Sequence, residues 1–349
     1  MKSALLAFLA ALFFFVSSLP APAEPIHGAG STFAYPVIAR WSESCLTDRA
    51  GGTDINFMGS GIDYEPVGSL AGILRLTQPE MDFAASDAPL PPEDLEKFGF
   101  VQFPLVVGGI VPVVNLDNVA PGGLQLSGEV LAKIYLGTIQ NWSDPAILAL
   151  NSGLKLPDLK ITVIHRADGS GSTFNWTSFL SAVSPEWKNK YGADTLISWP
   201  LGTSVERSSG VVGAVKATKG AIGYVEYGQV ARAELTFATV RNRAGKFVRP
   251  EPQSFALTAA KAPWSPDNGF HLSLVDSAET DAWPITAATY ILMRRDPDSA
   301  SRARQALWFF NHALSRGAAD AEALFYVPLP PPLVEQVKAY WASELNFGS

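Results

Sequence analysis

The chain has 349 residues, of which 47% are hydrophobic and 17% are charged, and its formal net charge at pH 7 is -7. This composition describes a compact globular protein and excludes a disordered or coiled-coil chain. The acidic balance argues against nucleic acid and anionic lipid surfaces as partners. It does not exclude an anionic ligand, because net charge governs long-range steering whereas backbone amides act at contact distance.

The first residues predict an exported protein. Lys2 precedes an apolar run over residues 4–16, which is too short to span a bilayer, and Ala21-Pro22-Ala23 follows as a small-residue cleavage site. We therefore interpret residues 1–23 as the signal peptide of a periplasmic protein rather than as a membrane anchor. The single cysteine, Cys45, lies beyond the cleavage site, so we expect neither a lipid-attachment cysteine nor an intrachain disulfide.

Along the rest of the chain, short β-rich runs alternate with helical patterns, which predicts an α/β fold. We expect strands within residues 62–67, 82–85, 101–105, 110–114, 160–164 and 222–225. Ser127 is placed to cap a helix over residues 130–136, and Gly317 is placed to end a helix that contains Trp308. Prolines suited to a first helical turn stand at positions 36, 145, 331 and 332. The roughly 326 residues that follow Ala23 exceed one ordinary core, so we expect two domains.

One loop is especially informative: Arg166-Ala167-Asp168-Gly169-Ser170-Gly171-Ser172-Thr173. It follows the expected strand at 160–164 and precedes a helical pattern through Trp176. The glycines allow backbone N–H groups to turn inward, the hydroxyls add donors, and Arg166 supplies a forked cation, which together describe a site for a tetrahedral oxyanion. Asp168 is close enough in sequence to pair with Arg166. The alternative is a polar strand-to-helix turn with a capping serine.

Three other turns have a similar makeup. Gly28-Ala29-Gly30-Ser31-Thr32-Phe33 leads into a helix at Pro36, which places the amides of Thr32 and Phe33 near the positive end of that helix. Gly68-Ser69-Leu70-Ala71-Gly72 is a second such turn, and Asp87 follows a small-residue strand, where open α/β sheets bind ligands. Each turn could equally be a simple cap. None of the glycine spacings matches a Walker or dinucleotide fingerprint.

Five motifs resemble those of the periplasmic phosphate-binding proteins of the high-affinity phosphate ABC importer, in the same order and over essentially the whole chain after the signal peptide. They are Gly-Ala-Gly-Ser-Thr-Phe, Ala-Ala-Ser-Asp-Ala-Pro-Leu, Arg-Ala-Asp-Gly-Ser-Gly-Ser, Gly-Ala-Ile-Gly-Tyr-Val-Glu-Tyr and Asp-Ala-Trp-Pro-Ile-Thr. The resemblance implies a two-lobed type II periplasmic-binding-protein fold with a hinge and phosphate buried between the lobes. It further implies a monomeric binding protein, not an enzyme, that needs no cofactor or metal and delivers phosphate to a membrane ABC permease.

Carried over residue by residue, the resemblance also implies a set of phosphate ligands and a division into lobes. The ligands would be Thr32, Phe33, Ser69, Asp87, Arg166, Ser170, Gly171 and Ser172. One lobe would hold residues 24–114 and 289–349, and the other residues 115–288.

The chain departs from the family pattern at three places. Ser172 stands where threonine is common, but the hydroxyl and the amide are both retained. Leu70 follows Ser69 where a small polar residue is usual. The chain before Ser69 is also longer than the pattern, and Gly59-Ser60-Gly61 offers an earlier Gly-Ser turn, so Ser60 is a rival to Ser69. The spacing to Asp87 favours Ser69.

Asp87 is the unexpected residue in a site for an anion. An ionised carboxylate can only accept hydrogen bonds, and phosphate near neutral pH still carries a proton to donate, whereas sulfate carries none. We therefore expect Asp87 to reject sulfate through the repulsion of unmatched lone pairs, which costs about 1–3 kcal/mol or more when buried.

Two alternatives belong to other functional classes. A secreted phosphatase or hydrolase could use Ser170 as a nucleophile, but Gly169-Ser170-Gly171 is not the Gly-x-Ser-x-Gly elbow. His165 is the only histidine nearby, and strand alternation should point it away from Arg166. No His/Asp/Glu cluster has metal-site spacing. The other alternative, a phosphate sensor on the same scaffold, is compatible with the sequence.

Overall fold

The computed structural model describes residues 25–52 and 60–345. The predicted signal peptide, residues 1–23, lies outside the described residues. The strands are β1 (Ile26–Gly30), β2 (Ile62–Glu65), β3 (Phe83–Ser86), β4 (Phe100–Val114), β5 (Leu124–Ser127), β6 (Thr162–Arg166), β7 (Thr203–Val205), β8 (Ala221–Glu226), β9 (Thr236–Arg241), β10 (Phe247–Val248), β11 (Thr286–Arg294) and β12 (Val327–Pro328).

Helices alternate with most of these strands, as the sequence predicts. They are α2 (Tyr35–Ala50), α3 (Ser69–Arg75), α4 (Pro92–Phe98), α5 (Gly128–Tyr135), α6 (Pro145–Leu148), α7 (Gly171–Val183), α8 (Pro185–Lys190), α9 (Arg207–Ala217), α10 (Tyr227–Arg232), α11 (Pro252–Lys261), the 3-10 turn η1 (Pro266–Asn268), α12 (Ala300–Arg316), α13 (Ala318–Ala323) and α14 (Pro331–Glu344). None of the described helices has both the length and the apolar character of a bilayer-spanning segment.

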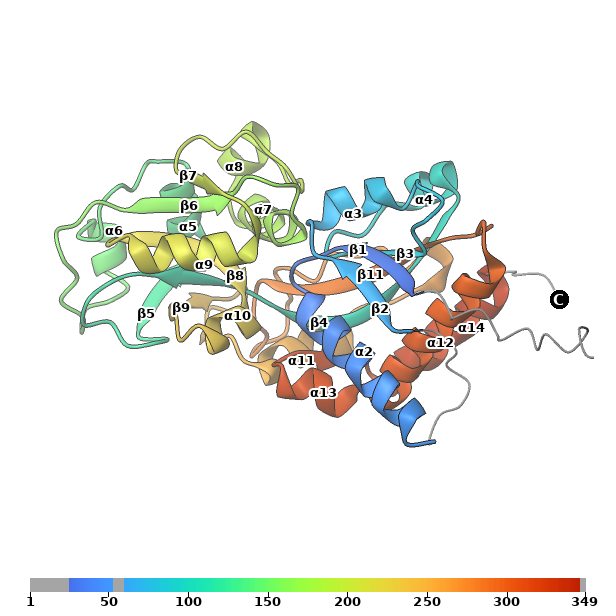
Figure 1. Ribbon diagram of the computed structural model, residues 1–349. Helices are drawn as coiled ribbons and strands as arrows, with labels where there is room; N and C mark the ends of the chain where they lie inside the picture. Colours follow the sequence, from blue (N-terminus) through green and yellow to red (C-terminus); the bar gives the residue numbers. More distant parts are fainter. Residues whose placement is uncertain (1–24, 53–59, 346–349) are drawn as a thin grey trace, which may run out of the picture.

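The strands form two groups that share β4. In the first group, β1 pairs in parallel with β2 and β3, and β11 runs antiparallel between β3 and the first part of β4. In the second group, the last residues of β4 pair with β8 and β9, while β8 continues to β6 and β7. Figure 1 shows the resulting two lobes, with β4 passing from one into the other. The two-lobed α/β fold expected from the motifs is confirmed.

β4 differs from the expectation of two separate strands at 101–105 and 110–114, because it is one uninterrupted strand. Gly108 and Gly109, which stand between the two expected strands, lie inside it. A Cβ on Gly108 would come within 2.6 Å of the Phe33 ring, and one on Gly109 within 2.3 Å of the Phe255 ring. The two glycines therefore make room for aromatic rings against the middle of the strand, where the chain crosses between the lobes.

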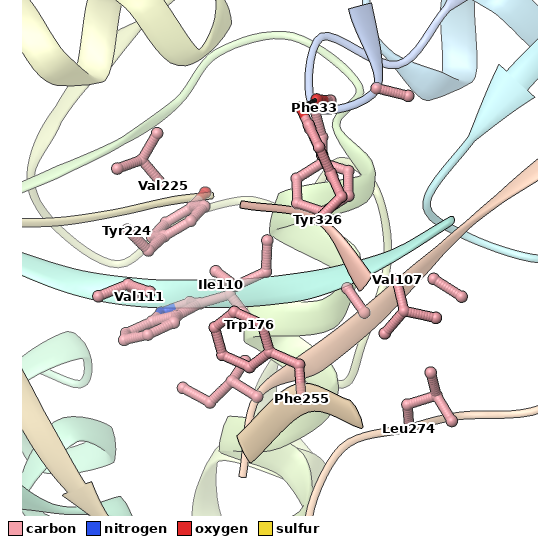
Figure 2. Packing of buried hydrophobic residues seen from close by; sticks show 14 of the residues in the cluster. Phe33, Val107, Ile110, Val111, Trp176, Tyr224, Val225, Phe255, Leu274 and Tyr326 are labelled. Atoms are coloured by element: carbon pink, nitrogen blue, oxygen red, sulfur yellow. Dashed lines mark hydrogen bonds between the residues drawn. The ribbon is translucent and has the colours of Figure 1, made fainter. Parts of the chain in front are cut away.

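The hydrophobic core continues through this crossing. Figure 2 shows Val107, Ile110 and Val111 of β4 surrounded by aromatic side chains from both lobes. On the side of the second lobe, Trp176 of α7 stacks on Tyr224 of β8 with ring centroids 5.1 Å apart. This packing gives α7, which follows the Arg166 loop, a rigid support.

The predicted helix signals act as expected. The Ser127 hydroxyl accepts a hydrogen bond from the Val130 amide at the start of α5. Gly317 is the C-terminal cap of α12, which contains Trp308, and α14 begins at Pro331.

His165 lies on β6 and stacks on Trp199, 4.8 Å away between ring centroids.

Candidate functional site

The turns singled out in the sequence meet at one place. Ser31 and Thr32 follow β1, and Asp87 follows β3, so the parallel pairing of β1 with β3 brings their ends to the same sheet edge. Ser69 begins α3, and the loop after β6 approaches from the other lobe. The loops touch directly, because the Leu70 amide donates to the Gly169 carbonyl at 3.2 Å.

Ser69 lies at the centre of this meeting point and is 1% exposed. Its hydroxyl oxygen accepts hydrogen bonds from the amides of Asp87 and Gly171, each at 3.2 Å, which leaves the hydroxyl proton available to donate. Gly171 has to be glycine here, since a Cβ would come within 2.6 Å of both the Ser69 hydroxyl and the Asp87 side chain. Ser60, the rival residue, is exposed and lies before β2.

This difference leads to a mutational prediction. Ser69→Ala should weaken ligand binding by roughly tenfold, because it removes a hydroxyl donor and leaves two buried amides without their acceptor. Ser60→Ala should leave the affinity unchanged and serves as the matched control. Titration calorimetry on both variants measures the difference, and a larger loss for Ser60→Ala would mean that the earlier Gly-Ser turn is the binding turn.

Asp87 is 2% exposed, and its carboxyl group accepts hydrogen bonds from two hydroxyl groups. The Ser31 hydroxyl lies 2.8 Å from both carboxylate oxygens, and the Thr289 hydroxyl donates to Oδ1 at 2.6 Å. Burial raises the pKa of Asp87 to about 7, although the hydrogen bonds from Thr289 and Ser31 and the charge of Arg166 favour the ionised form. The carboxyl group is thus poised to gain or lose a proton near neutral pH.

Arg166 is 2% exposed and is held in one plane by Asp168. Its Nε donates to Asp168 Oδ1 at 2.7 Å, and its Nη2 pairs with Asp168 Oδ2. Burial alone would raise the pKa of Asp168, but the hydrogen bond and charge of Arg166 outweigh it and hold that pKa below its ordinary value. The remaining nitrogen, Nη1, lies 3.4 Å from the hydroxyls of Thr32 and Ser208. The pairing expected from the sequence is present.

The other predicted ligands lie around the same point. Ser170 is the N-cap of α7, and its hydroxyl accepts a hydrogen bond from the Thr173 amide at 3.3 Å, so the expectation of a capping serine in this loop is confirmed. Ser172 lies in the first turn of α7 and is 2% exposed. Phe33 is buried against Gly108, and its carbonyl accepts a hydrogen bond from Tyr326. The structure therefore brings all eight predicted residues into one neighbourhood that spans the two lobes.

Several polar residues of this neighbourhood were missed at the sequence level. They are Ser31, Asn175, Ser208, Glu226 and Thr289, all buried. Ser31 and Glu226 lie within motifs that the family resemblance uses, which is a signal that could have identified them. Thr289 and Ser208 have no local signal, because β11 and α9 reach the site only through the tertiary fold.

Within residues 25–52 and 60–345, no three His, Cys, Asp or Glu side chains are placed to hold a metal ion. The Nδ1 atom of His165 lies 3.2 Å from the Arg166 carbonyl, and its ring stacks on Trp199, so this histidine is oriented by packing. Burial lowers the pKa of His165.

Comparisons with known proteins agree with this arrangement. A family model described as a PBP superfamily domain matches residues 16–316. The phosphate-binding protein PstS of Xylella fastidiosa (strain 9a5c) is 44% identical over 321 residues, which cover 92% of this chain and 86% of the relative. The chain belongs to the PstS family of phosphate-binding proteins. The PstS protein of Pasteurella multocida is 40% identical over 97% of this chain and 96% of the relative.

Solved structures support the same fold. A high-affinity periplasmic phosphate-binding protein bound with phosphate at pH 8.5 has a TM-score of 0.70 at 20% identity, covering 90% of this chain and 93% of that one. A phosphate ABC transporter substrate-binding protein from Clostridium perfringens has a TM-score of 0.62 at 17% identity, covering 88% and 100%. The PstS relatives are named as binding proteins, and this PstS family member is a binding protein rather than an enzyme.

Proposed function

We propose that this PstS family member captures inorganic phosphate in the periplasm and delivers it, as a monomer, to a membrane ABC permease. The observation that carries the proposal is that one buried site contains both a hydrogen-bond acceptor and several donors. The carboxyl group of Asp87 accepts hydrogen bonds from hydroxyl groups, while Arg166 and several amides and hydroxyls supply donors. A protonated tetrahedral oxyanion satisfies both kinds of group at once. The names of the PstS relatives point to the same ligand.

In this proposal, each ligand residue has a defined task. Arg166 and the hydroxyls of Ser69, Ser170 and Ser172 donate to phosphate oxygens, and Asp87 accepts the proton that the ion still carries. The amides of Thr32 and Phe33, in the turn before α2, complete the set of donors, and the Gly171 amide at the start of α7 orients the Ser69 hydroxyl. The fixed donors replace the hydration shell of the ion, and no cofactor or metal is required.

The lobes would close around the ion from two sides. We assign residues 24–114 and 289–349 to one lobe and residues 115–288 to the other, with β4 as a connection between them. Thr32, Phe33, Ser69 and Asp87 belong to the first lobe, whereas Arg166 and the residues at the start of α7 belong to the second. Because groups on both lobes have to touch one small ion, binding favours the closed form.

Titration calorimetry of the protein without its signal peptide tests the function. Phosphate is expected to bind at least tenfold more tightly than sulfate at pH 8, since only phosphate carries a proton for Asp87. An absence of heat with phosphate would refute phosphate capture. Equal affinities for the two ions would leave the oxyanion site but remove its proposed selectivity.

Export is a separate prediction. We expect cleavage after Ala23, because Ala21-Pro22-Ala23 follows a short apolar run. The intact mass of protein recovered from the periplasm should correspond to residues 24–349. A species that retains Met1 or carries a lipid would contradict the prediction.

A further inference from the structure

Ser208 connects the proposed phosphate ligands to a buried carboxyl group that the proposed function does not use. It lies in the first turn of α9 and is 2% exposed. Its hydroxyl oxygen lies 3.0 Å from Glu226 Oε2 and 3.0 Å from the Thr32 hydroxyl. Arg166 Nη1 is 3.4 Å away. Thr32 belongs to the turn after β1 in the first lobe, whereas α9 and β8, which carry Ser208 and Glu226, pack in the second lobe.

The hydrogen-bonding capacity of Ser208 is filled by these three partners. A serine hydroxyl donates once and accepts twice, and an ionised carboxylate only accepts. With Glu226 ionised, Ser208 donates to Glu226 and accepts from Thr32 and Arg166. The Thr32 proton is then committed to Ser208, so that Thr32 offers the phosphate ion its amide rather than its hydroxyl. A protonated Glu226 would reverse the direction of the chain but keep the link from Ser208 to Thr32.

The start of α9 has a strained backbone, and a specific hydrogen bond holds it in place. Arg207, which precedes Ser208, has a positive φ of 61° although it is not glycine. Such a conformation persists where the surroundings impose it, and it is often found at functional positions. Here the Arg207 amide donates to Asp168 Oδ1 at 3.0 Å, so the carboxylate that orients Arg166 also positions Ser208.

Burial of the Glu226 carboxyl group in this position costs free energy, which argues that the residue has a specific role in the site. It is fully buried, and its Oε1 atom has no hydrogen-bond partner within the described part of the chain. Burial raises its pKa, whereas the charges of Arg166 and Arg232 favour the carboxylate. Buried carboxyl oxygens are normally paired, and those that are not need an explanation.

We propose that Glu226, Ser208 and Thr32 form a hydrogen-bonded latch between the lobes, which stabilises the closed form of the phosphate site. Ser208 and Glu226 are positioning residues: they act through Thr32 and Arg166 and do not select between anions. The latch adds an interlobe connection next to the ion, so its loss lowers the closed population and thereby the apparent affinity. This inference rests on the proposed phosphate function and adds the residues that hold the site shut.

A double-mutant cycle on the full exported protein tests the latch. Ser208→Ala and Thr32→Val each remove one hydroxyl, and Thr32→Val keeps the shape and the amide of the residue. Each single variant is expected to bind phosphate about tenfold more weakly, and the double variant also about tenfold more weakly, because the same link is broken in all three. Ser209→Ala, an exposed serine on the same helix, should match the wild type.

Additive losses, about a hundredfold in the double variant, would overturn the latch and indicate that the two hydroxyls act independently. Wild-type affinity in Ser208→Ala would overturn it as well. Small-angle scattering of the ligand-free proteins gives a second readout, in which the latch variants should have a larger radius of gyration than the wild type and identical curves would contradict the proposal. If the wild type failed to bind phosphate, the proposed function would be wrong, and the scattering comparison would still test the latch.

Discussion

Asp87→Asn is expected to abolish most of the discrimination between phosphate and sulfate. The amide of asparagine can donate a hydrogen bond to a sulfate oxygen, whereas the ionised carboxylate can only repel it. The cost of an unmatched buried lone-pair contact, about 1–3 kcal/mol, corresponds to a loss of roughly 5- to 150-fold in the ratio of the two dissociation constants. The affinity for phosphate should change less, since removal of a negative charge offsets the lost hydrogen bond.

The pH dependence of the wild type provides an independent measurement of the same residue. Because burial raises the pKa of Asp87 to about 7, the carboxyl group is protonated at pH 5.5 and ionised at pH 8. A protonated Asp87 can donate to sulfate, so sulfate binding should strengthen by up to about tenfold for each unit by which the pH falls towards 7, and should level off below 7. In Asp87→Asn, the ratio of the two affinities should stay nearly constant over this range, apart from the titration of phosphate itself.

The same pKa shift provides a check that the variant is folded. Since folding raises this pKa from 3.8 to about 7, the contribution of Asp87 to stability is fully present below its ordinary pKa and is lost as the pH rises through about 7. Asp87→Asn should therefore melt no earlier than the wild type at pH 8. Asp298→Asn, at a side chain that is 60% exposed, is the matched control for the change in charge. A folded variant that still rejects sulfate would place the selectivity elsewhere.

The sequence was sufficient for most of the elements and for the motifs, because these depend on local chemistry. Ser127 acts as a cap whatever surrounds it, and Asp168 is near enough to Arg166 in the chain to pair with it. The site could be recognised only in part. Asp87 and its donor Thr289 are 202 positions apart, so their contact depends on the order of strands in the sheet. Ser208 had no local signal at all, since its role depends on the approach of the start of α9 to the turn after β1.

β4 illustrates the opposite limit, in which a local pattern leads to a wrong prediction: two strands were expected over residues 101–105 and 110–114, and the structure has one. Gly108-Gly109 between two apolar runs is typical of a turn, because glycine weakens a strand and often marks a break. In the structure, the pair lies opposite the rings of Phe33 and Phe255, and any Cβ there would clash. The phenylalanines are distant in sequence, so only the tertiary structure distinguishes a turn from a close approach.

Arg166→Ala should produce the largest loss of phosphate affinity among single substitutions at the site. It deletes a buried cation, and it leaves the carboxyl groups of Asp168, Asp87 and Glu226 without their nearest positive partner. Truncation of one partner of a buried charge pair costs about 2–5 kcal/mol, which corresponds to roughly 30- to 5,000-fold in the dissociation constant. Calorimetry on the folded variant, with thermal melting to confirm folding, measures this loss.

Arg166→Lys should recover little of the lost affinity, and this comparison identifies what the arginine provides. In the wild type, Nε and Nη2 are both used to bind Asp168, and Nη1 is the nitrogen that points to the hydroxyls of Thr32 and Ser208. A lysine ammonium is a single point charge and cannot make the paired contact and the third contact in one plane. Arg243→Ala, at an exposed position, is the control for net charge. Full recovery of phosphate affinity by Arg166→Lys would show that the site needs only a positive charge. Unchanged affinity in Arg166→Ala would show that the loop serves only to cap α7.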